Sequence, residues 1–206
     1  MPHHSKKFGQ IYDPVMYLPE ELFLSRRRKK LLSGVSGKVF EVGVGTGINL
    51  KYYGNDIELT GIEPSPHMLA KADNRKRSLP HPERFTLHNI GCSYPEIEKM
   101  FQTDSLDVIV CTLVLCTIPE PERALKNLLK WLKPGGKLLI LEHIRSHHRA
   151  GTKLQNLVNP TWEKLAEGCQ LNRPTDTLIK ESGFHLIREK YFWLGIPFYE
   201  AEFRKP

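Results

Sequence analysis

Short apolar runs alternate with helix-like segments between residues 39 and 141. Runs rich in β-branched residues occupy positions 39–42, 57–62, 85–90, 106–111 and 137–141, and each predicts a β-strand. The run at 106–111 is apolar almost throughout, as in a strand that is buried on both faces of a sheet. Strands that alternate with helices are typical of a parallel sheet joined by right-handed crossovers, so we expect an α/β fold.

Three segments between these strands have helix signals. Residues 49–53 follow the first strand and are expected to lie in a helix. Ser65 and Pro66 supply an N-cap and a first-turn proline for a polar helix that extends to about residue 79. Within 121–132 the apolar positions recur at helical spacing, which predicts an amphipathic helix that ends at the K-P-G-G sequence of 133–136.

The C-terminal part has a different pattern. A helical stretch over about 153–182, broken near Arg173-Pro174, precedes two extended stretches at 184–193 and 198–204. These two stretches flank Gly195 and Pro197 and predict a hairpin that closes one edge of the sheet. The chain has no internal repeat and no linker, so a single domain over 1–206 is expected.

The composition fits one globular core. Hydrophobic residues make up 40% of the 206 residues and charged residues 26%. No run approaches the roughly 18 to 20 apolar residues of a membrane span, and the polar N-terminus lacks a signal-peptide core, so a cytoplasmic location is expected. The four cysteines form no C-x-x-C pair, and neither they nor the adjacent histidines predict a disulfide framework or a metal site.

The net charge of +7 includes a basic run at residues 26–30. This run is interpreted either as the solvated face of a helix or as a patch for anionic lipid headgroups, nucleic acid or an acidic substrate. No nucleic-acid motif with interleaved aromatic residues is present, so nucleic acid is not an expected partner. Peripheral contact with an anionic membrane stays open, and the pattern does not indicate an oligomeric state.

A glycine-rich sequence, E-V-G-V-G-T-G at 41–47, directly follows the first strand. Glycines let a backbone turn tightly and approach a ligand, and ligands of open α/β sheets bind outside the carboxyl ends of the strands. The spacing differs from the dinucleotide pattern G-x-G-x-x-G, because Ile48 stands where the third glycine would be. Glu63 ends the second strand, where a carboxylate can accept both hydroxyls of an adenosine ribose and would repel a ribose phosphate.

These motifs resemble those of class I S-adenosylmethionine-dependent methyltransferases. The resemblance covers about 39–136 and includes E-V-G-V-G-T-G, G-I-E-P-S, S-L-D-V-I-V-C-T-L-V-L-C and L-K-P-G-G-K-L-L-I-L-E-H. It implies a Rossmann-like α/β fold with a mostly parallel seven-stranded sheet and a C-terminal antiparallel hairpin strand. It also implies S-adenosyl-L-methionine as cofactor, with an N-terminal arm and helix in 1–37, a cofactor-binding core in 38–145, and acceptor-side helices and the hairpin in 146–206.

The same resemblance implies roles for single residues. The glycine loop would hold the methionine end of the cofactor and Glu63 its ribose. An N-terminal tyrosine, Tyr12 or less favourably Tyr17, would close over its carboxylate end, with a packed aromatic anchor for the N-terminal arm as the alternative. Where the family often has an acidic residue after the third strand, this chain has N-I-G-C-S at 89–93, whose backbone or serine hydroxyl would contact the adenine. The implied cofactor-binding residues are Tyr12, Glu41, Gly43, Gly45, Gly47, Glu63, Pro64, Ser65, Met68, Gly91, Cys92, Ser93, Thr112 and Leu113.

A longer resemblance extends toward the C-terminus. The sequences V-C-T-L-V-L-C-T-I, L-E-H and N-P-T-W-E-K-L-A-E-G-C-Q-L-N-R are similar to the alkyl-thiol methyltransferase-like group. E-V-G-V-G-T-G-I-N-L-K-Y-Y is similar to bacterial phosphatidylethanolamine N-methyltransferases. The implied function is methyl transfer by in-line displacement to a small-molecule or lipid acceptor (a thiol, amine or headgroup). A non-catalytic S-adenosylmethionine-binding protein and an NAD-dependent oxidoreductase are the alternatives.

Methyl transfer from a sulfonium needs little catalytic machinery beyond alignment, exclusion of water and one base. His143 is the predicted catalytic base because histidine titrates near neutral pH, and a structural histidine is the alternative. Other candidates at the strand ends are Thr112, Cys116 and Glu142. A segment with Trp162, Cys169, Asn172 and Arg173 is expected to cover the acceptor, with core packing as the alternative for Trp162. Arg173 is predicted either to hold an anionic acceptor group or to form a surface salt bridge.

Overall fold

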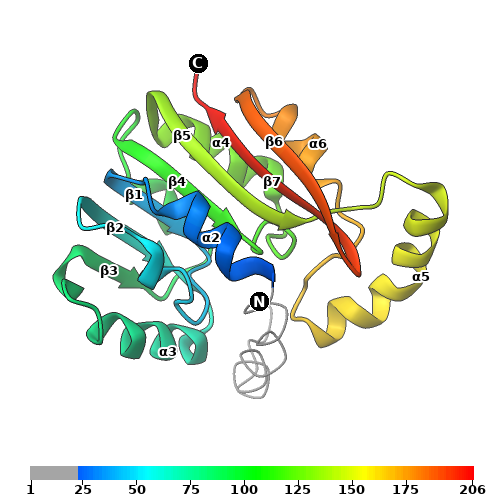
Figure 1. The fold of residues 1–206 in the computed structure, drawn as a ribbon, viewed down its shortest axis with the longest axis horizontal. Coiled ribbons are helices and arrows are strands. Elements are labelled where there is room, and N and C mark those ends of the chain that lie inside the picture. Colours follow the sequence, from blue (N-terminus) through cyan, green and yellow to red (C-terminus); the bar gives the residue numbers. More distant parts are fainter. Residues whose placement is uncertain (1–22) are drawn as a thin grey trace.

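The computed structural model describes residues 23–206, which form one sheet with helices on both faces (Figure 1). The sheet has seven strands in the order β3-β2-β1-β4-β5-β7-β6. Five strands pair in parallel, and β7 pairs antiparallel with both β5 and β6. The strands are β1 (Gly37–Val42), β2 (Ile57–Ile62), β3 (Phe85–His88), β4 (Leu106–Thr112), β5 (Leu132–His143), β6 (His185–Leu194) and β7 (Ile196–Arg204). The predicted α/β fold, its parallel core and its C-terminal hairpin are confirmed.

The helices connect these strands in the expected alternation. The α-helices are α2 (Ser25–Leu32), α3 (Pro66–Arg77), α4 (Pro121–Trp131), α5 (Arg149–Leu165) and α6 (Thr175–Lys180). Three short 3-10 helices are η2 (Leu50–Tyr52), η3 (Pro82–Arg84) and η4 (Pro95–Lys99). Helix α5 stands apart from the sheet, at one side of the molecule (Figure 1). Among the described residues, no helix is both long and apolar enough to cross a bilayer.

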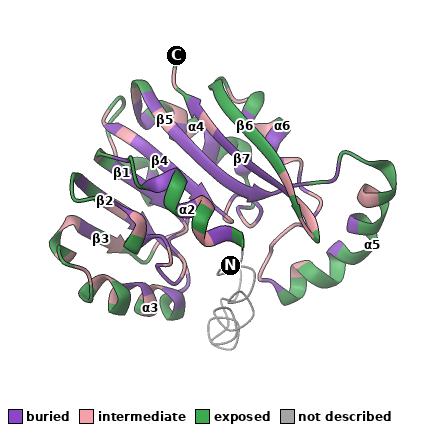
Figure 2. Ribbon diagram, in the orientation of Figure 1, coloured by how far each residue is buried: buried purple, intermediate pink, exposed green. Residues whose placement is uncertain are grey.

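The sheet separates two hydrophobic cores, because successive side chains of a strand point to opposite faces. In β4, Ile109 and Cys111 belong to the core that also contains Trp131 of α4. Val108 and Val110 belong to the other core, together with Leu31 of α2. Strands β4, β5 and β7 are therefore buried along most of their length (Figure 2), which explains why the 106–111 run is apolar at nearly every position.

Some predicted boundaries were wrong. The segment 49–53 forms only the short η2, and β3 ends at His88 instead of residue 90. Residues 133–136 end α4 as expected but bulge out within β5, since Leu106 pairs with Leu132 and Val108 pairs with Lys137. The break in the 153–182 stretch begins earlier than predicted, because Glu167 and Gly168 adopt left-handed backbone angles just after α5 ends.

Candidate functional site

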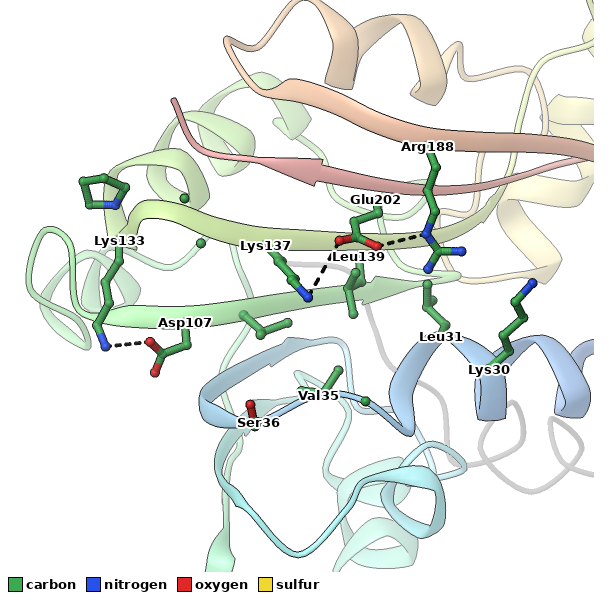
Figure 3. A pocket seen from close by; sticks show the side chains of 15 residues that line it. Lys30, Leu31, Val35, Ser36, Asp107, Lys133, Lys137, Leu139, Arg188 and Glu202 are labelled. Atoms are coloured by element: carbon green, nitrogen blue, oxygen red, sulfur yellow. Dashed lines mark hydrogen bonds and ion pairs between the residues drawn. The ribbon is translucent and has the colours of Figure 1, made fainter.

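Two hollows lie at opposite ends of the strands. The smaller, about 380 Å³, lies at the amino ends of β4 and β5. Both of its carboxylates are paired with cations: Lys133 lies 2.6 Å from Asp107, and Arg188 lies 2.9 Å from Glu202 (Figure 3). The larger cavity, about 710 Å³, adjoins the glycine loop at the carboxyl ends of β1 and β4. The carboxyl ends are where open α/β sheets bind ligands, and the volume suits a small molecule, so this larger cavity is the candidate site.

The three glycines of the loop all have positive φ, but for different reasons. A Cβ on Gly43 would lie 2.3 Å from Cγ2 of Val114, and one on Gly47 would lie 2.9 Å from Cα of Ala72. These two positions are fixed by packing, and Gly47 is not part of the cavity wall. A Cβ on Gly45 would meet only Cε of Met68, at 3.6 Å. Gly45 therefore presents bare backbone to the cavity, as a close ligand contact requires.

Glu63 is buried in the cavity wall at the end of β2. Its Oε2 accepts a hydrogen bond from Gly45 N at 3.0 Å, and its Oε1 accepts one from Ser65 N at 2.9 Å. These two N–H groups fix the carboxylate beside the glycine loop. A carboxylate can accept about four hydrogen bonds, so one that the backbone already positions can also accept ligand hydroxyls.

Glu41, a predicted cofactor residue, lies beneath the loop and is not among the residues that line the cavity. It accepts hydrogen bonds from Asn49 Nδ2 at 2.7 Å and from the Tyr53 hydroxyl at 2.9 Å. Its complete burial raises its pKa to about 7. Asn49 itself lines the cavity, so Glu41 positions the wall through Asn49.

Arg28 is a cavity residue that the sequence pattern did not reveal. Its side chain is only 4% exposed and donates to Asn49 Oδ1 at 2.8 Å and to Thr112 Oγ1 at 2.9 Å. The basic run at 26–30 was interpreted as one surface, but Arg28 shares the helix face of Leu24 and Leu31, which are both buried. That helical spacing from two leucines was the available signal for a buried arginine.

The structure brings most of the predicted cofactor residues to one cavity. The lining includes Gly43, Gly45, Glu63, Pro64, Met68, Gly91, Cys92, Ser93, Thr112 and Leu113. Ser65 lies outside the lining, because its hydroxyl caps α3 by accepting from Met68 N. Asn89 joins the ends of β2 and β3 by donating to the carbonyls of Glu63 and Pro64, at 2.8 and 3.0 Å. Tyr12 and Tyr17 lie outside the described residues.

The far end of the cavity brings together three side chains that are distant in sequence. Cys116 follows β4, His143 ends β5, and Cys169 lies between α5 and α6. His143 Nε2 lies 3.1 Å from Cys169 Sγ, which lies 3.6 Å from Cys116 Sγ. Hydrogen bonding with Cys116 and with His143 lowers the pKa of Cys169 to about 4. No local spacing connects positions 116, 143 and 169, so only the tertiary fold reveals this cluster.

Comparison with known proteins identifies the family. A methyltransferase domain family matches residues 40–140. A thiol S-methyltransferase of Rattus norvegicus, TMT1B, is 34% identical over 175 residues, which is 82% of this chain and 68% of that protein. A phosphatidylethanolamine N-methyltransferase of Cereibacter sphaeroides is 30% identical over 118 residues, covering 57% of this chain and 56% of that protein. The chain belongs to the class I S-adenosylmethionine-dependent methyltransferases.

A solved structure agrees with this identification at the level of the fold. The SAM-dependent methyltransferase of Thermotoga maritima, described as a possible histamine N-methyltransferase, superposes with a TM-score of 0.68 at 21% identity. The match covers 100% of this methyltransferase and 99% of the other chain. The cofactor of the family is S-adenosylmethionine. The bare backbone at Gly45 and the positioned carboxylate of Glu63 fit its methionine and ribose parts, within a cavity large enough for the whole molecule.

Two further candidates of the sequence analysis, Glu142 and Arg173, make structural contacts in this methyltransferase. Glu142 is buried and accepts hydrogen bonds from Val114 N at 2.8 Å and Leu115 N at 3.0 Å. Arg173 is also buried, and its Nη1 donates to the carbonyls of Leu115 and Ile118. Neither side chain lines the cavity. Both hold the loop after β4, and the prediction of a surface salt bridge for Arg173 is wrong because the side chain is buried.

Trp162 and Asn172 have different surroundings in the acceptor-side segment. Trp162 lines the cavity and is partly exposed. The alternative prediction, that it packs in the core, is therefore wrong. Asn172 donates to Asn156 Oδ1 at 2.9 Å and does not line the cavity. Trp162 and the Cys116–His143–Cys169 cluster therefore line the same cavity as the glycine loop.

Proposed function

We propose that this methyltransferase transfers the methyl group of S-adenosylmethionine to the sulfur of a small apolar thiol. The observation that carries the proposal is the acceptor end of the cavity, where the polar His143–Cys169 pair is set among apolar side chains. The apolar lining at this end comes from Trp162, Leu165, Leu194, Ile196 and Phe198. Such a surface favours an acceptor with an apolar carbon skeleton. The polar pair beside it favours an acceptor that carries a single polar reacting group.

In this proposal the cofactor occupies the end of the cavity at the glycine loop. Glu63 accepts the two ribose hydroxyls, and the backbone at Gly45 contacts the methionine part. The buried guanidinium of Arg28, beside Thr112, offers a cation for the cofactor's carboxylate. The segment 91–93 lies along the same wall and borders the adenine.

The reaction is then an in-line displacement at the sulfonium methyl group. The protein aligns the acceptor sulfur with the methyl carbon and excludes water, and these two effects supply most of the rate enhancement. The acceptor must lose a proton to become the thiolate nucleophile, because a thiol is a far weaker nucleophile than its thiolate. His143 and Cys169 are ionisable groups that meet at that end of the cavity, next to the thiol of Cys116.

The test is a methyl-transfer screen that follows formation of S-adenosylhomocysteine. The panel pairs each alkyl thiol with the alcohol and the amine of the same carbon skeleton, and adds quinols and vesicles that contain phosphatidylethanolamine. We expect turnover with thiols and at least about 100-fold lower kcat/KM with matched alcohols, since only the thiol ionises readily. Turnover confined to the lipid or to the amines would contradict the thiol proposal and favour headgroup methylation.

We further propose that α5 lies on the surface of an anionic membrane. Along one face of this helix, apolar side chains at exposed positions recur at helical spacing, and Leu157 is 78% exposed. These side chains are Leu154, Leu157, Val158, Trp162 and Leu165. Trp162 and Leu165 also line the cavity, so this face continues into its mouth. Exposed Lys153 and Lys164 complete a basic amphipathic helix, a pattern typical of interfacial binding.

Substitution of Leu157 tests this contact. Leu157→Glu is expected to weaken binding to phosphatidylglycerol-containing vesicles by about tenfold or more, because it places a negative charge in the apolar face. Vesicle co-sedimentation measures the change. Leu186→Glu, at another exposed leucine on β6, is the matched control and should bind like the unsubstituted protein. Equal binding by both variants, or no binding by the unsubstituted protein, would contradict the proposal.

A further inference from the structure

The Cys116–His143–Cys169 cluster has the composition of a metal site. Two sulfur atoms and one imidazole nitrogen, from three separate parts of the chain, lie within 4.8 Å of one another. Cysteine and histidine are the preferred ligands of Zn²⁺. The second ring nitrogen of His143, Nδ1, is buried and has no hydrogen-bond partner among the described residues. The polar contact of this imidazole is therefore made through Nε2, the atom that faces the two sulfurs.

The distances in the cluster are close to those of a tetrahedral zinc centre. Bond lengths of about 2.3 Å to sulfur and about 2.0–2.1 Å to nitrogen place two sulfur ligands about 3.8 Å apart, and sulfur and nitrogen about 3.6 Å apart. The observed separations are 3.6 Å between Cys116 Sγ and Cys169 Sγ, and 3.1 Å between Cys169 Sγ and His143 Nε2. Displacements of a few tenths of an ångström would bring these two pairs to the separations of a zinc site, and the third pair, Cys116 Sγ and His143 Nε2, lies within 4.8 Å.

Three protein ligands leave one position of a tetrahedral zinc ion open. Catalytic zinc sites use three protein ligands in this way, and a set of two cysteines and one histidine is one of their known forms. All three side chains line the cavity, so the open position would face the space that the acceptor occupies. On binding, a divalent cation would compensate the charge of the two cysteine sulfurs that become its ligands.

We propose that Cys116, His143 and Cys169 bind Zn²⁺, and that the sulfur of the acceptor thiol takes the fourth position. The metal site stands on its own geometry, whereas its use with a thiol acceptor rests on the proposed function. On coordination the thiol loses its proton to solvent, and its sulfur becomes a thiolate. That sulfur forms a bond to the methyl carbon as the carbon's bond to the cofactor sulfonium breaks. The products are a neutral thioether, which binds zinc weakly, and S-adenosylhomocysteine.

Metal content is the first measurement. Protein purified under reducing conditions, stripped with a chelator and then dialysed against Zn²⁺ is expected to retain about one zinc ion per chain, measured by mass spectrometry. Cys169→Ser and Cys116→Ser should each lower zinc affinity by about 100-fold or more, because each removes a thiolate ligand. Cys111→Ala is the matched control, since Cys111 is a buried cysteine of β4 outside the cluster and should retain the metal.

Two further readouts separate this site from a merely structural cluster. Substitution with Co²⁺ should give the intense visible bands and thiolate-to-metal charge transfer of a tetrahedral site in the unsubstituted protein, and not in Cys169→Ser. Calorimetry should show that Cys169→Ser still binds S-adenosylmethionine, which demonstrates that the variant is folded. Failure of the unsubstituted protein to bind zinc would overturn the site, whether Cys116 and Cys169 stay reduced or form a disulfide.

The outcomes for metal and for acceptor are distinguishable. If thiols are methylated at an unchanged rate after zinc is removed, the metal assignment is wrong and the proposed function stands. If zinc binds at these three residues but no thiol is methylated, the site stands and the proposed acceptor is wrong. Loss of thiol methylation on zinc removal, with recovery when Zn²⁺ is restored, supports both.

Discussion

Glu63→Ala is expected to weaken S-adenosylmethionine binding by about 100-fold. Hydrogen bonds to a charged group contribute about 1.5–3 kcal/mol each, and the variant removes the acceptor for two ribose hydroxyls. It also removes the acceptor of Gly45 N and Ser65 N, so the glycine loop loses a contact that fixes its shape. Isothermal titration calorimetry with the cofactor and with S-adenosylhomocysteine measures the change in Kd.

Two controls make this result specific. Glu63→Gln keeps one carbonyl oxygen and should give an intermediate loss of affinity. Glu58→Ala removes an exposed carboxylate from β2, the strand that ends just before Glu63, and should leave Kd unchanged. A Kd of Glu63→Ala within about twofold of the unsubstituted value would show that the ribose is held elsewhere. The loss of one hydrogen bond to a charged group should already weaken binding by about tenfold, which corresponds to 1.4 kcal/mol.

Arg173→Ala is expected to lower the free energy of unfolding by about 3 kcal/mol. The side chain is 7% exposed, and its guanidinium donates to the carbonyl oxygens of Leu115 and Ile118. Its removal leaves two carbonyls without a donor, and each unsatisfied buried group is worth about 1–3 kcal/mol. Urea denaturation measures the loss. Turnover should also fall, because the loop that these bonds hold contains Cys116 of the cavity wall.

A neighbouring arginine provides the comparison. Arg145 has an exposed side chain, and its backbone N–H donates to the carbonyl of Arg173 at 2.8 Å. Arg145→Ala retains that backbone bond and should change the unfolding free energy by less than about 0.5 kcal/mol. If Arg173→Ala were equally silent, the guanidinium would have no role in holding the loop, and an acceptor-binding role would regain support.

The elements that could be predicted from the sequence have local signals. The uniform apolar run of β4, the helical spacing of α4 and the Ser65 N-cap each depend on neighbouring residues, and each lies where expected. The errors occur where tertiary pairing decides the outcome. The bulge at 133–136 arises because β5 pairs with β4 on both sides of it, which no local pattern encodes.

The same distinction applies to the site. The glycine loop and Glu63 are adjacent to predicted strand ends, so topology alone places them together. Glu41 belongs to the same motif but points to Asn49 and Tyr53, because alternation along β1 turns it away from the cavity. Arg28 and Cys169 reach the cavity from helices and connections outside the motif, and no spacing rule connects them to it.

The position of β7 between β5 and β6 has a consequence for synthesis. Strand β5 is made early, yet its second hydrogen-bonding partner is encoded only after α5, α6 and β6. Until that partner leaves the ribosome, the nascent chain presents an unpaired apolar strand, the kind of edge that recruits other chains. The sheet can therefore be completed only after its last strand has been translated and has left the ribosome, so ribosome stalling before Ile196 should yield a product that chaperones and proteases recognise as unfinished.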